Sequence, residues 1–360
     1  MKRIIISVTN DISYDQRMQK TANTLIESGF EVTIVGRKRS NSISIKNERF
    51  QHHRFTMIFD KGKGFYIEYQ IRLFIYLLFH SANIFCSVDL DTILPNVFIG
   101  KLKNIPVIYD AHEYFTEVPE LVGRKTEQSI WKLIEKICIP QCKYMYTVCP
   151  SIAQLYSNEY NNHCDIIYNF PKNIPLESSP NNFDKKIILY QGNLNYGRGL
   201  EQMILAMKSI EGILWICGNG DLYKNLIFLI DMNGLSKKVI LWGNLTPSEL
   251  QKITSQATIG INLLENRGLN YYYSLANKYF DYIQHRIPSI CINFPEYKRL
   301  NDEIECSLLI DNIESDTISN GINRLFSDKE YYKKLQNNCD IASQKYIWDS
   351  QKERLISYYI

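Results

Sequence analysis

Short runs of apolar, often β-branched residues alternate along this chain with longer segments of helical periodicity. The first run, Ile4 to Val8, is typical of a buried parallel strand. The next segment, Asp15 to Ser28, repeats its apolar residues at helical spacing, and Gly29 is a typical helix end. A second run, Glu31 to Val35, completes one β–α–β unit.

The same alternation continues over most of the chain. Further apolar runs predict strands at residues 84–87, 106–109, 144–148, 165–168, 187–190, 213–217, 239–242, 259–263 and 289–292. Helical periodicity predicts helices at residues 65–80, 96–102, 130–138, 152–159, 200–208, 222–233 and 247–256, and only helices after residue 296. Residues 40–57 are polar and show no clear period. Strands that alternate with helices predict an α/β fold with parallel sheets.

A linker composition separates two halves of this pattern. Lys172 to Asp184 holds two Pro, three Asn and two Ser in thirteen residues. The sequence therefore predicts an N-terminal domain at 1–170, a linker at 171–184 and a C-terminal domain at 185–340. A last helix at 341–360 is expected to cross back to the N-terminal domain. The length, 360 residues, suits two domains that each bury a core.

The segment from Ser274 to Pro288 predicts an amphipathic helix with an unusual polar face. Ser274 is the expected N-cap, because its hydroxyl can accept a free amide of the first turn. Asn277, Lys278 and Asp281 share the polar face. A helix N-terminus beside a lysine can hold a phosphate, and a carboxylate one turn on can accept hydrogen bonds from sugar hydroxyls. The alternative is a surface helix in which Lys278 and Asp281 form an i,i+3 pair.

Ionisable residues also follow several predicted strands. Asp89 follows the strand at 84–87, and Asp110, His112 and Glu113 follow the strand at 106–109. Open α/β sheets bind ligands at the carboxyl ends of their strands. We interpret His112 as a candidate acid–base or polar group, with a structural histidine as the alternative. Asp15 and Arg17 follow the first strand and could instead pair with each other to hold the first helix.

Composition narrows the class of protein. The chain is 45% apolar and 22% charged, as in folded soluble proteins, and its net charge of +3 gives no reason to expect nucleic-acid binding. Nine cysteines without a paired C-x-x-C indicate reduced core thiols of a cytoplasmic protein and no metal site. The N-terminal apolar run is too short for a signal peptide, and no run is long enough to span a bilayer. No G-x-G-x-x-G opens the first helix, which disfavours a nicotinamide cofactor.

Positive charge is concentrated in one region. Between Arg37 and Arg72 there are nine Lys or Arg against three Asp or Glu. This region also holds the aromatic residues Phe65, Tyr66, Tyr69, Phe74 and Tyr76. Basic and aromatic surfaces can rest on an anionic membrane, a hypothesis in which Lys61 and Lys63 contribute. The alternative is that the aromatic residues form the core face of one helix.

The order of these motifs resembles that of the GT-B glycosyltransferases, in particular the retaining family-4 type, also called group 1. The resemblance extends nearly from end to end. It is carried by Asp15-x-Arg17, by Tyr109-Asp110-Ala111-His112-Glu113, by the loop Gln191 to Gly199, by the turns Leu214 to Gly220 and Gly243 to Leu245, and by Asn277 to Pro288. It implies two Rossmann-like domains whose parallel sheets face each other across a cleft.

The resemblance also implies roles for individual residues. Arg198 and Lys278 would contact the donor diphosphate, which Gly192 and Asn193 would border, and Asp281 would accept the ribose hydroxyls. The turn of Gly243, Asn244 and Leu245 would meet the base, and Asn277 would border the donor. His112 and Glu113 would lie at the sugar being transferred, and Asp15, Arg17, Asp89 and Asp110 would lie on the acceptor side. This chain departs from the family pattern at four positions, which are Asn193, Tyr273, Asp281 and Arg286.

By resemblance, the chain would move a hexosyl group from a nucleoside-diphosphate sugar to a glycan or polyprenyl-linked acceptor. Relatives are thought to use front-face attack without a protein nucleophile, and neither a cofactor nor a metal would be required. Surface polysaccharide synthesis in the cytoplasm, peripheral to the inner face of the plasma membrane, is the implied setting. Two alternatives remain: a GT-B sugar-nucleotide epimerase, and a catalytically degenerate GT-B subunit, which Asn193 and Tyr273 would favour.

Overall fold

The computed structural model describes residues 1–40, 42–45, 49–174 and 183–360, which form two compact units. Unit 1 comprises Met1–Asn169 and Gln351–Ile360, and unit 2 comprises Phe170–Ser350. Most of the predicted linker, residues 175–182, lies outside the described residues. The chain returns to unit 1 at Gln351, ten residues later than the predicted start of the last helix.

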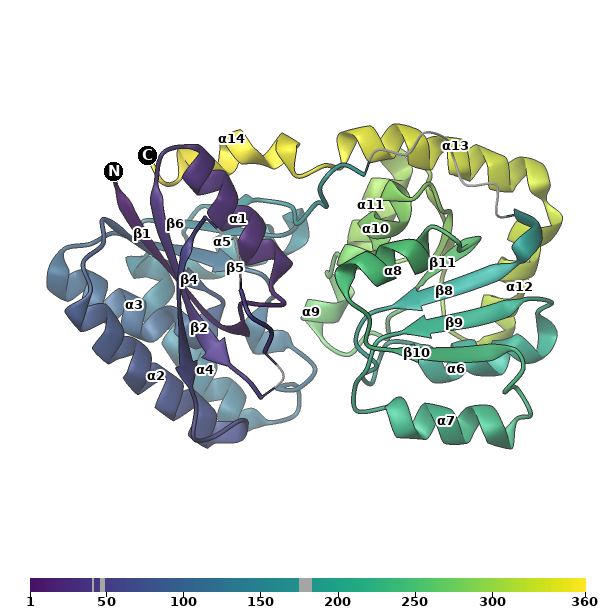
Figure 1. The fold of residues 1–360 in the computed structure, drawn as a ribbon, viewed down its shortest axis with the longest axis horizontal. Coiled ribbons are helices and arrows are strands. Elements are labelled where there is room, and N and C mark those ends of the chain that lie inside the picture. The colour runs from purple at the N-terminus through teal and green to yellow at the C-terminus, as the bar shows by residue number, and fades with distance from the viewer. Residues whose placement is uncertain (41, 46–48, 175–182) are drawn as a thin grey trace. The chain divides into compact units, whose positions relative to one another are not determined.

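In the described part of unit 1, seven parallel strands pair in the order β3-β2-β1-β4-β5-β6-β7 (Figure 1). The strands are β1 (Arg3–Asp11), β2 (Glu31–Lys38), β3 (Gln51–Thr56), β4 (Ile84–Val88), β5 (Val107–Ala111), β6 (Tyr144–Thr147) and β7 (Cys164–Ile166). The helices are α1 (Gln16–Glu27), α2 (Gly62–Phe79), α3 (Leu90–Lys103), α4 (Lys125–Cys138), α5 (Pro150–Tyr160) and most of α14 (Asp349–Ser357). Arg354 of α14 forms an ion pair with Asp165 at 2.6 Å, which ties the end of the chain to this sheet.

In the described part of unit 2, six parallel strands pair in the order β10-β9-β8-β11-β12-β13. The strands are β8 (Ile187–Gln191), β9 (Ile213–Cys217), β10 (Val239–Gly243), β11 (Ile259–Asn262), β12 (Ser289–Ile292) and β13 (Ser307–Ile310). The helices are α6 (Leu200–Ala206), α7 (Tyr223–Met232), α8 (Pro247–Thr254), α9 (Leu269–Tyr272), α10 (Asn277–Gln284), α11 (Pro295–Glu303), α12 (Ser315–Ser327) and α13 (Lys329–Lys345). The predicted α/β fold with parallel sheets is confirmed.

Each sheet contains one point at which the strand order reverses. In unit 1 this point lies between β1 and β4, and in unit 2 it lies between β8 and β11. Loops at the carboxyl ends of neighbouring strands diverge there, because the following helices lie on opposite faces of the sheet. Most of the predicted site residues lie at the ends of β1, β4, β5, β8 and β10 or in the segment after β11.

The structure contains two strands that were not predicted, and it does not contain one predicted helix cap. β3 lies in the segment without clear periodicity, and β13 lies where only helices were expected. The missing cap is Ser274, because α10 begins at Asn277 and Ala276 precedes it. The Ala276 amide instead donates to the Tyr297 hydroxyl at 2.9 Å. A side chain from α11 satisfies this free amide, and the local sequence gives no sign of it.

α3 begins six residues earlier than predicted. Pro95 therefore lies inside the helix instead of before it. Proline has no amide hydrogen, so it cannot bond the carbonyl four residues before it. That carbonyl belongs to Asp91, and the Gln70 amide of α2 donates to it instead. The hydrogen bond from α2 thus replaces the one that the proline removes.

The core consists of apolar side chains on both faces of each sheet, and all nine cysteines are buried thiols outside any disulfide. Burial raises the pKa of the Cys86 thiol to about 12 and that of the Cys138 thiol to about 11. Within the described ranges, no helix is both long and apolar enough to cross a membrane.

Candidate active site: an acidic cluster in unit 1 and a cation pair in unit 2

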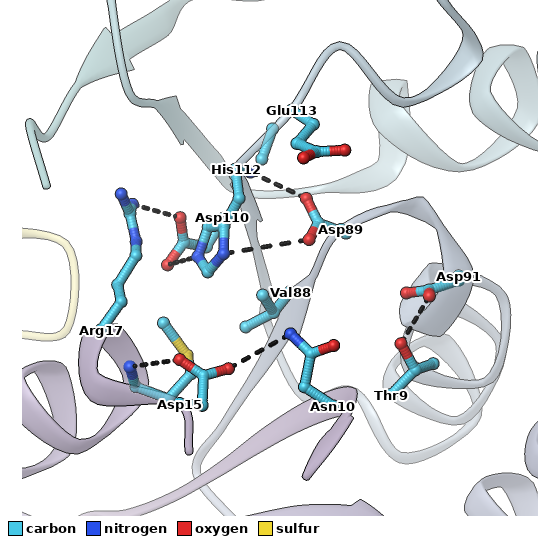
Figure 2. Close-up of polar contacts among 12 residues, drawn as sticks. Thr9, Asn10, Asp15, Arg17, Val88, Asp89, Asp91, Asp110, His112 and Glu113 are labelled. Atoms are coloured by element: carbon cyan, nitrogen blue, oxygen red, sulfur yellow. Dashed lines mark hydrogen bonds and ion pairs between the residues drawn. The ribbon is translucent and has the colours of Figure 1, made fainter. Parts of the chain in front are cut away.

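His112 lies just past the carboxyl end of β5, between two carboxylates (Figure 2). Its Nε2 is 3.2 Å from Asp110 Oδ2, and its Nδ1 is 3.9 Å from Asp89 Oδ2. The backbone amide of His112 also donates to Asp89 Oδ1 at 2.8 Å. Asp89 follows β4, so two neighbouring strands hold the ring in a fixed orientation. His112, Asp89, Asp110 and Arg17 are called the His112 cluster below.

Arg17 completes this cluster from helix α1. Its guanidinium donates to Asp110 Oδ1 at 2.8 Å, and the two side chains are 6% and 1% exposed. A buried carboxylate needs such a partner, because burial without one costs several kcal/mol, on the order of 3–5. Asp110 therefore has one oxygen on Arg17 and the other facing His112 (Figure 2).

These contacts shift the pKa of each group in the cluster. Burial works to raise the pKa of Asp110, but the charges of Arg17 and His112 outweigh it and hold the pKa below 3.8. Burial and Arg17 act to lower the pKa of His112, but Asp110 and Asp89 outweigh them and raise it above 6.5. Burial raises the pKa of Asp89 above 3.8, although His112 opposes this. The imidazole therefore holds a proton more readily than a free histidine.

Three of the predicted residues behave differently from expectation. Asp15 and Arg17 do not pair, because Asp15 caps α1 by accepting the Met18 amide at 3.1 Å. Its second oxygen accepts from Asn10 at 3.3 Å. Glu113 is exposed, and Figure 2 shows its carboxylate pointing away from the His112 ring. Asp15 thus positions the helix that carries Arg17, and Glu113 lies outside the His112 cluster.

Asp91 is a buried carboxylate near this cluster that the sequence analysis did not select. It lies in the first turn of α3 and accepts the Thr9 hydroxyl at 2.6 Å (Figure 2). Burial, together with the negative charge of Asp89, raises its pKa to about 8. Asp91 is therefore protonated at neutral pH. Its position two residues after Asp89, at a strand end, was the available signal.

In unit 2, two glycine turns make room at the end of β8. Gly192 and Gly218 have φ angles of +132° and +142°. A Cβ on Gly218 would lie 1.9 Å from the Gly192 carbonyl oxygen, so no other residue fits there. The Gly218 amide donates to the Gly243 carbonyl at 2.8 Å, which joins the turn after β9 to that after β10. The three predicted glycine turns are therefore packed into one edge of the sheet.

Lys278 and Arg198 lie at this edge and are called the cation pair. Lys278 is 8% exposed, and its Nζ lies 3.7 Å from the centre of the Tyr190 ring. The Arg198 guanidinium lies 4.7 Å from the centre of the Tyr271 ring. Burial first, and then the charge of Arg198, lower the pKa of Lys278 well below 10.5. Across the part of the chain that the structure describes, neither cation forms an ion pair.

Asp281 is held in place by residues that the sequence analysis did not select. Its Oδ2 accepts the Gln191 amide at 2.9 Å, and Gln191 Oε1 accepts the Thr254 hydroxyl at 2.9 Å. Gln191 is the last residue of β8 and is buried. The i,i+3 pair of Asp281 with Lys278, which was the alternative, does not form. Asp281 is only partly buried.

The remaining predicted donor residues surround the same edge. Gly192, Asn193, Asn244 and Asn277 have exposed surface there. Asn193 supplies its carbonyl to the Tyr190 hydroxyl at 2.7 Å, which fixes the loop over the lysine. Leu245 packs its side chain into a core cluster, which leaves its backbone as the part available to a ligand. Among the described residues, no group of three or more His, Cys, Asp or Glu is placed to hold a metal ion.

The chain is similar to known glycosyltransferases in both sequence and structure. Residues 174–340 match the family described as "Glycosyl transferases group 1". An uncharacterized glycosyltransferase of Methanocaldococcus jannaschii is 26% identical over 209 residues, which are 53% of this chain and about half (47%) of that relative's length.

Two solved structures share the whole fold. Sucrose-phosphate synthase from Thermosynechococcus elongatus superposes with a TM-score of 0.80 at 14% identity, over 100% of this chain and 98% of that one. HepE from Anabaena, in complex with UDP-glucose, gives a TM-score of 0.78 at 12% identity, over 100% and 99% of the two chains. At this level of identity the likeness shows the fold, which is the two-unit GT-B fold predicted from the sequence.

Proposed function

We propose that this chain, whose residues 174–340 match the group 1 glycosyltransferases, moves a hexosyl group from a nucleoside-diphosphate sugar to the hydroxyl of a glycan or polyprenyl-linked acceptor. One observation carries the donor assignment. Lys278 and Arg198 gather at a strand edge beside packed glycine turns, and neither forms an ion pair with any residue that the structure describes. Such an arrangement is complementary to a diphosphate.

In this proposal unit 2 binds the donor. The diphosphate lies against Lys278, Arg198 and the Gly192 turn, and the partly buried Asp281 carboxylate accepts a hydrogen bond from ribose. The base lies against the backbone of residues 243–245. A uridine nucleotide is the first choice, since the solved complex of HepE contains UDP-glucose and its fold is the same. The cation pair supplies the charge that a metal would otherwise provide, so no metal is invoked.

Unit 1 binds the acceptor in this proposal. The bond from the anomeric carbon to the β-phosphate oxygen breaks, and a bond to the acceptor oxygen forms. The acceptor proton passes to the leaving phosphate, which the cation pair stabilises. His112, held by Asp110 and Asp89, orients the sugar and acceptor rather than acting as a nucleophile. Retention of anomeric configuration, a role in surface polysaccharide synthesis and a cytoplasmic location belong to the same proposal.

Calorimetric titration of the full chain with UDP and UDP-glucose tests the donor assignment. Lys278→Met and Arg198→Met should each weaken binding about 10- to 100-fold, the value of a charge-assisted hydrogen bond to phosphate. Matched controls exist, because Arg324 stacks on Tyr331 at 4.6 Å and Lys329 stacks on Phe183 at 5.3 Å. Arg324→Met and Lys329→Met should leave UDP affinity unchanged.

Three results would overturn the proposal or redirect it. Equal affinity for UDP in the cation-pair variants and in their controls would remove the donor site from this edge. Binding of neither UDP, GDP nor ADP by the native chain would favour the degenerate subunit. Conversion of the bound sugar without any acceptor would favour the epimerase.

A further inference from the structure

The outer surface of helices α2, α3 and α4 in unit 1 is apolar. Eleven large apolar side chains on these helices are exposed, several by more than half. They are Ile67, Ile71, Phe74, Ile75 and Phe79 of α2, Leu94, Phe98 and Leu102 of α3, and Ile130, Leu133 and Ile137 of α4. These residues are called the three-helix face. A helix that faces water normally carries polar residues there.

The aromatic residues expected at a membrane turn out to be divided between two faces. Phe65 and Tyr69 are buried against the sheet, as the core-face alternative predicted. The exposed side of α2 is instead formed by Ile67, Ile71 and Ile75, with Phe74 at its edge. α2 is therefore apolar on both sides, and only one side is covered by unit 1.

The three helices form one continuous surface. The rings of Phe74 and Phe98 lie 6.4 Å apart, which joins α2 to α3. The rings of Tyr66 and Trp131 lie 5.5 Å apart, and Lys63 pairs with Glu127 at 3.1 Å, which joins α2 to α4. Figure 1 shows α2, α3 and α4 packed beside one another in unit 1. The exposed residues therefore add up to a patch rather than a scatter of single side chains.

Positive charge surrounds this patch. The three helices carry exposed lysines at positions 63, 101, 125, 132 and 136. Their four carboxylates do not balance these charges, since Asp91 and Glu135 are buried, and Glu68 pairs with Arg72 at 2.8 Å. Glu127 is the fourth, and Lys63 pairs with it. Lys132 pairs with Glu117 at 2.9 Å, so the remaining positive charge among these exposed lysines is that of Lys101, Lys125 and Lys136. An apolar surface with a lysine border is complementary to the interface of an anionic bilayer.

We propose that the three-helix face docks unit 1 on an anionic lipid surface, with the apolar side chains in the interface and the lysines at the headgroups. A second copy of this chain fits the face less well. A two-fold contact would bring two copies of the same positively charged patch together, with Lys101, Lys125 and Lys136 in each. The docking does not rest on the donor chemistry, because lipid binding can be measured without a nucleotide sugar.

Flotation of the full chain with vesicles tests this proposal. The chain should float with vesicles of phosphatidylglycerol and phosphatidylcholine, and much less with phosphatidylcholine alone. Phe98→Asp should weaken binding roughly tenfold or more, because it removes an aromatic side chain that would enter the lipid interface and adds a negative charge. Phe228→Asp is the matched control, since Phe98 and Phe228 are 65% and 66% exposed and Phe228 lies on α7 of unit 2.

A second pair of variants tests the charge separately. Lys125→Gln with Lys136→Gln should weaken binding about 25-fold, near fivefold for each lysine, and more salt should weaken the native chain similarly. Lys224→Gln with Lys237→Gln in unit 2 is the control. No flotation with either vesicle, or equal flotation of Phe98→Asp and Phe228→Asp, would overturn the proposal. So would a native dimer that Phe98→Asp converts to a monomer, because the face would then join two copies.

Discussion

The His112 cluster and the cation pair both lie near the carboxyl ends of parallel strands, but only the first has ion-pair partners for its charges. In the His112 cluster each charge already has a partner, since Asp110 contacts both Arg17 and His112. In the cation pair, Lys278 and Arg198 rest on aromatic rings, and the described residues supply no carboxylate to either. The first site is electrostatically complete within the chain, whereas the second is complete only with an anion.

This difference separates what each site contributes. Partnered charges stabilise the fold and fix orientation, so their loss should appear first in stability. Buried charges without a partner cost stability, and their pKa moves toward the neutral form, as that of Lys278 does. A ligand that restores the missing charge recovers this cost, so their loss should appear first in binding.

The largest expected effect is in unit 1. Arg17→Met leaves the Asp110 carboxylate buried without its main partner and should lower the free energy of unfolding by about 3–5 kcal/mol. Arg198→Met, which breaks no ion pair, should cost no more than about 1 kcal/mol. Denaturant unfolding of both variants measures the contrast. Addition of Asp110→Asn to Arg17→Met should recover part of the loss, and equal costs for Arg17→Met and Arg198→Met would contradict the comparison.

An intermediate effect is expected at Asp281. Asp281→Asn can still accept the Gln191 amide through its oxygen, but its amide nitrogen cannot accept from a ribose hydroxyl. UDP affinity should therefore fall about 10-fold, while affinity for inorganic pyrophosphate should stay the same. Titration with both ligands separates the two outcomes. A similar loss for pyrophosphate would mean that Asp281 acts on the diphosphate site and not on ribose.

The smallest effect, taken over one pH unit, is the pH dependence that Asp91 imposes. Its pKa is about 8 in the folded chain and near 3.8 when unfolded, so the folded state binds the extra proton between these values. Stability should therefore fall as the pH rises through this window, by about 1 kcal/mol for each pH unit. Asp91→Asn removes the titrating group and should make unfolding curves less dependent on pH. Asp302→Asn, at an exposed carboxylate, should leave the dependence of stability on pH unchanged. If Asp91→Asn showed the same pH dependence as the native chain, Asp91 would be excluded as its source.

Much of the fold could be predicted because local signals agreed with the tertiary structure. The helix predicted to begin at Pro247 is an example, since Thr246 before it forms a complete capping box with Glu249. The order of strands and glycine turns was enough to identify the fold. β13 was missed because it is a short edge strand among helices, and the start of α10 was missed because its first amides depend on Tyr297.

The candidate site was predictable in its residue types but not in its pairings. His112, Asp110, Lys278 and Arg198 were all selected, because they follow strand ends or match a family motif. Their partners come from far along the chain, as Arg17 does for Asp110 across 93 residues. No periodicity encodes such a contact. Arg286, one of the departures from the family, lies in the left-handed region with a φ of +55°, and an ion pair with Asp340 at 2.9 Å holds its side chain.

The burial of all nine cysteines has a practical consequence for spectroscopy. Maleimide reagents attack accessible thiolates, and all nine thiols are covered, while burial also raises the pKa of Cys86, Cys138 and Cys217. A cysteine introduced at an exposed position would therefore be labelled selectively in the native chain, without first replacing the other nine. An environment-sensitive dye attached to Phe98→Cys would change its emission when the three-helix face leaves water. The same dye on Phe228→Cys in unit 2 would serve as the reference.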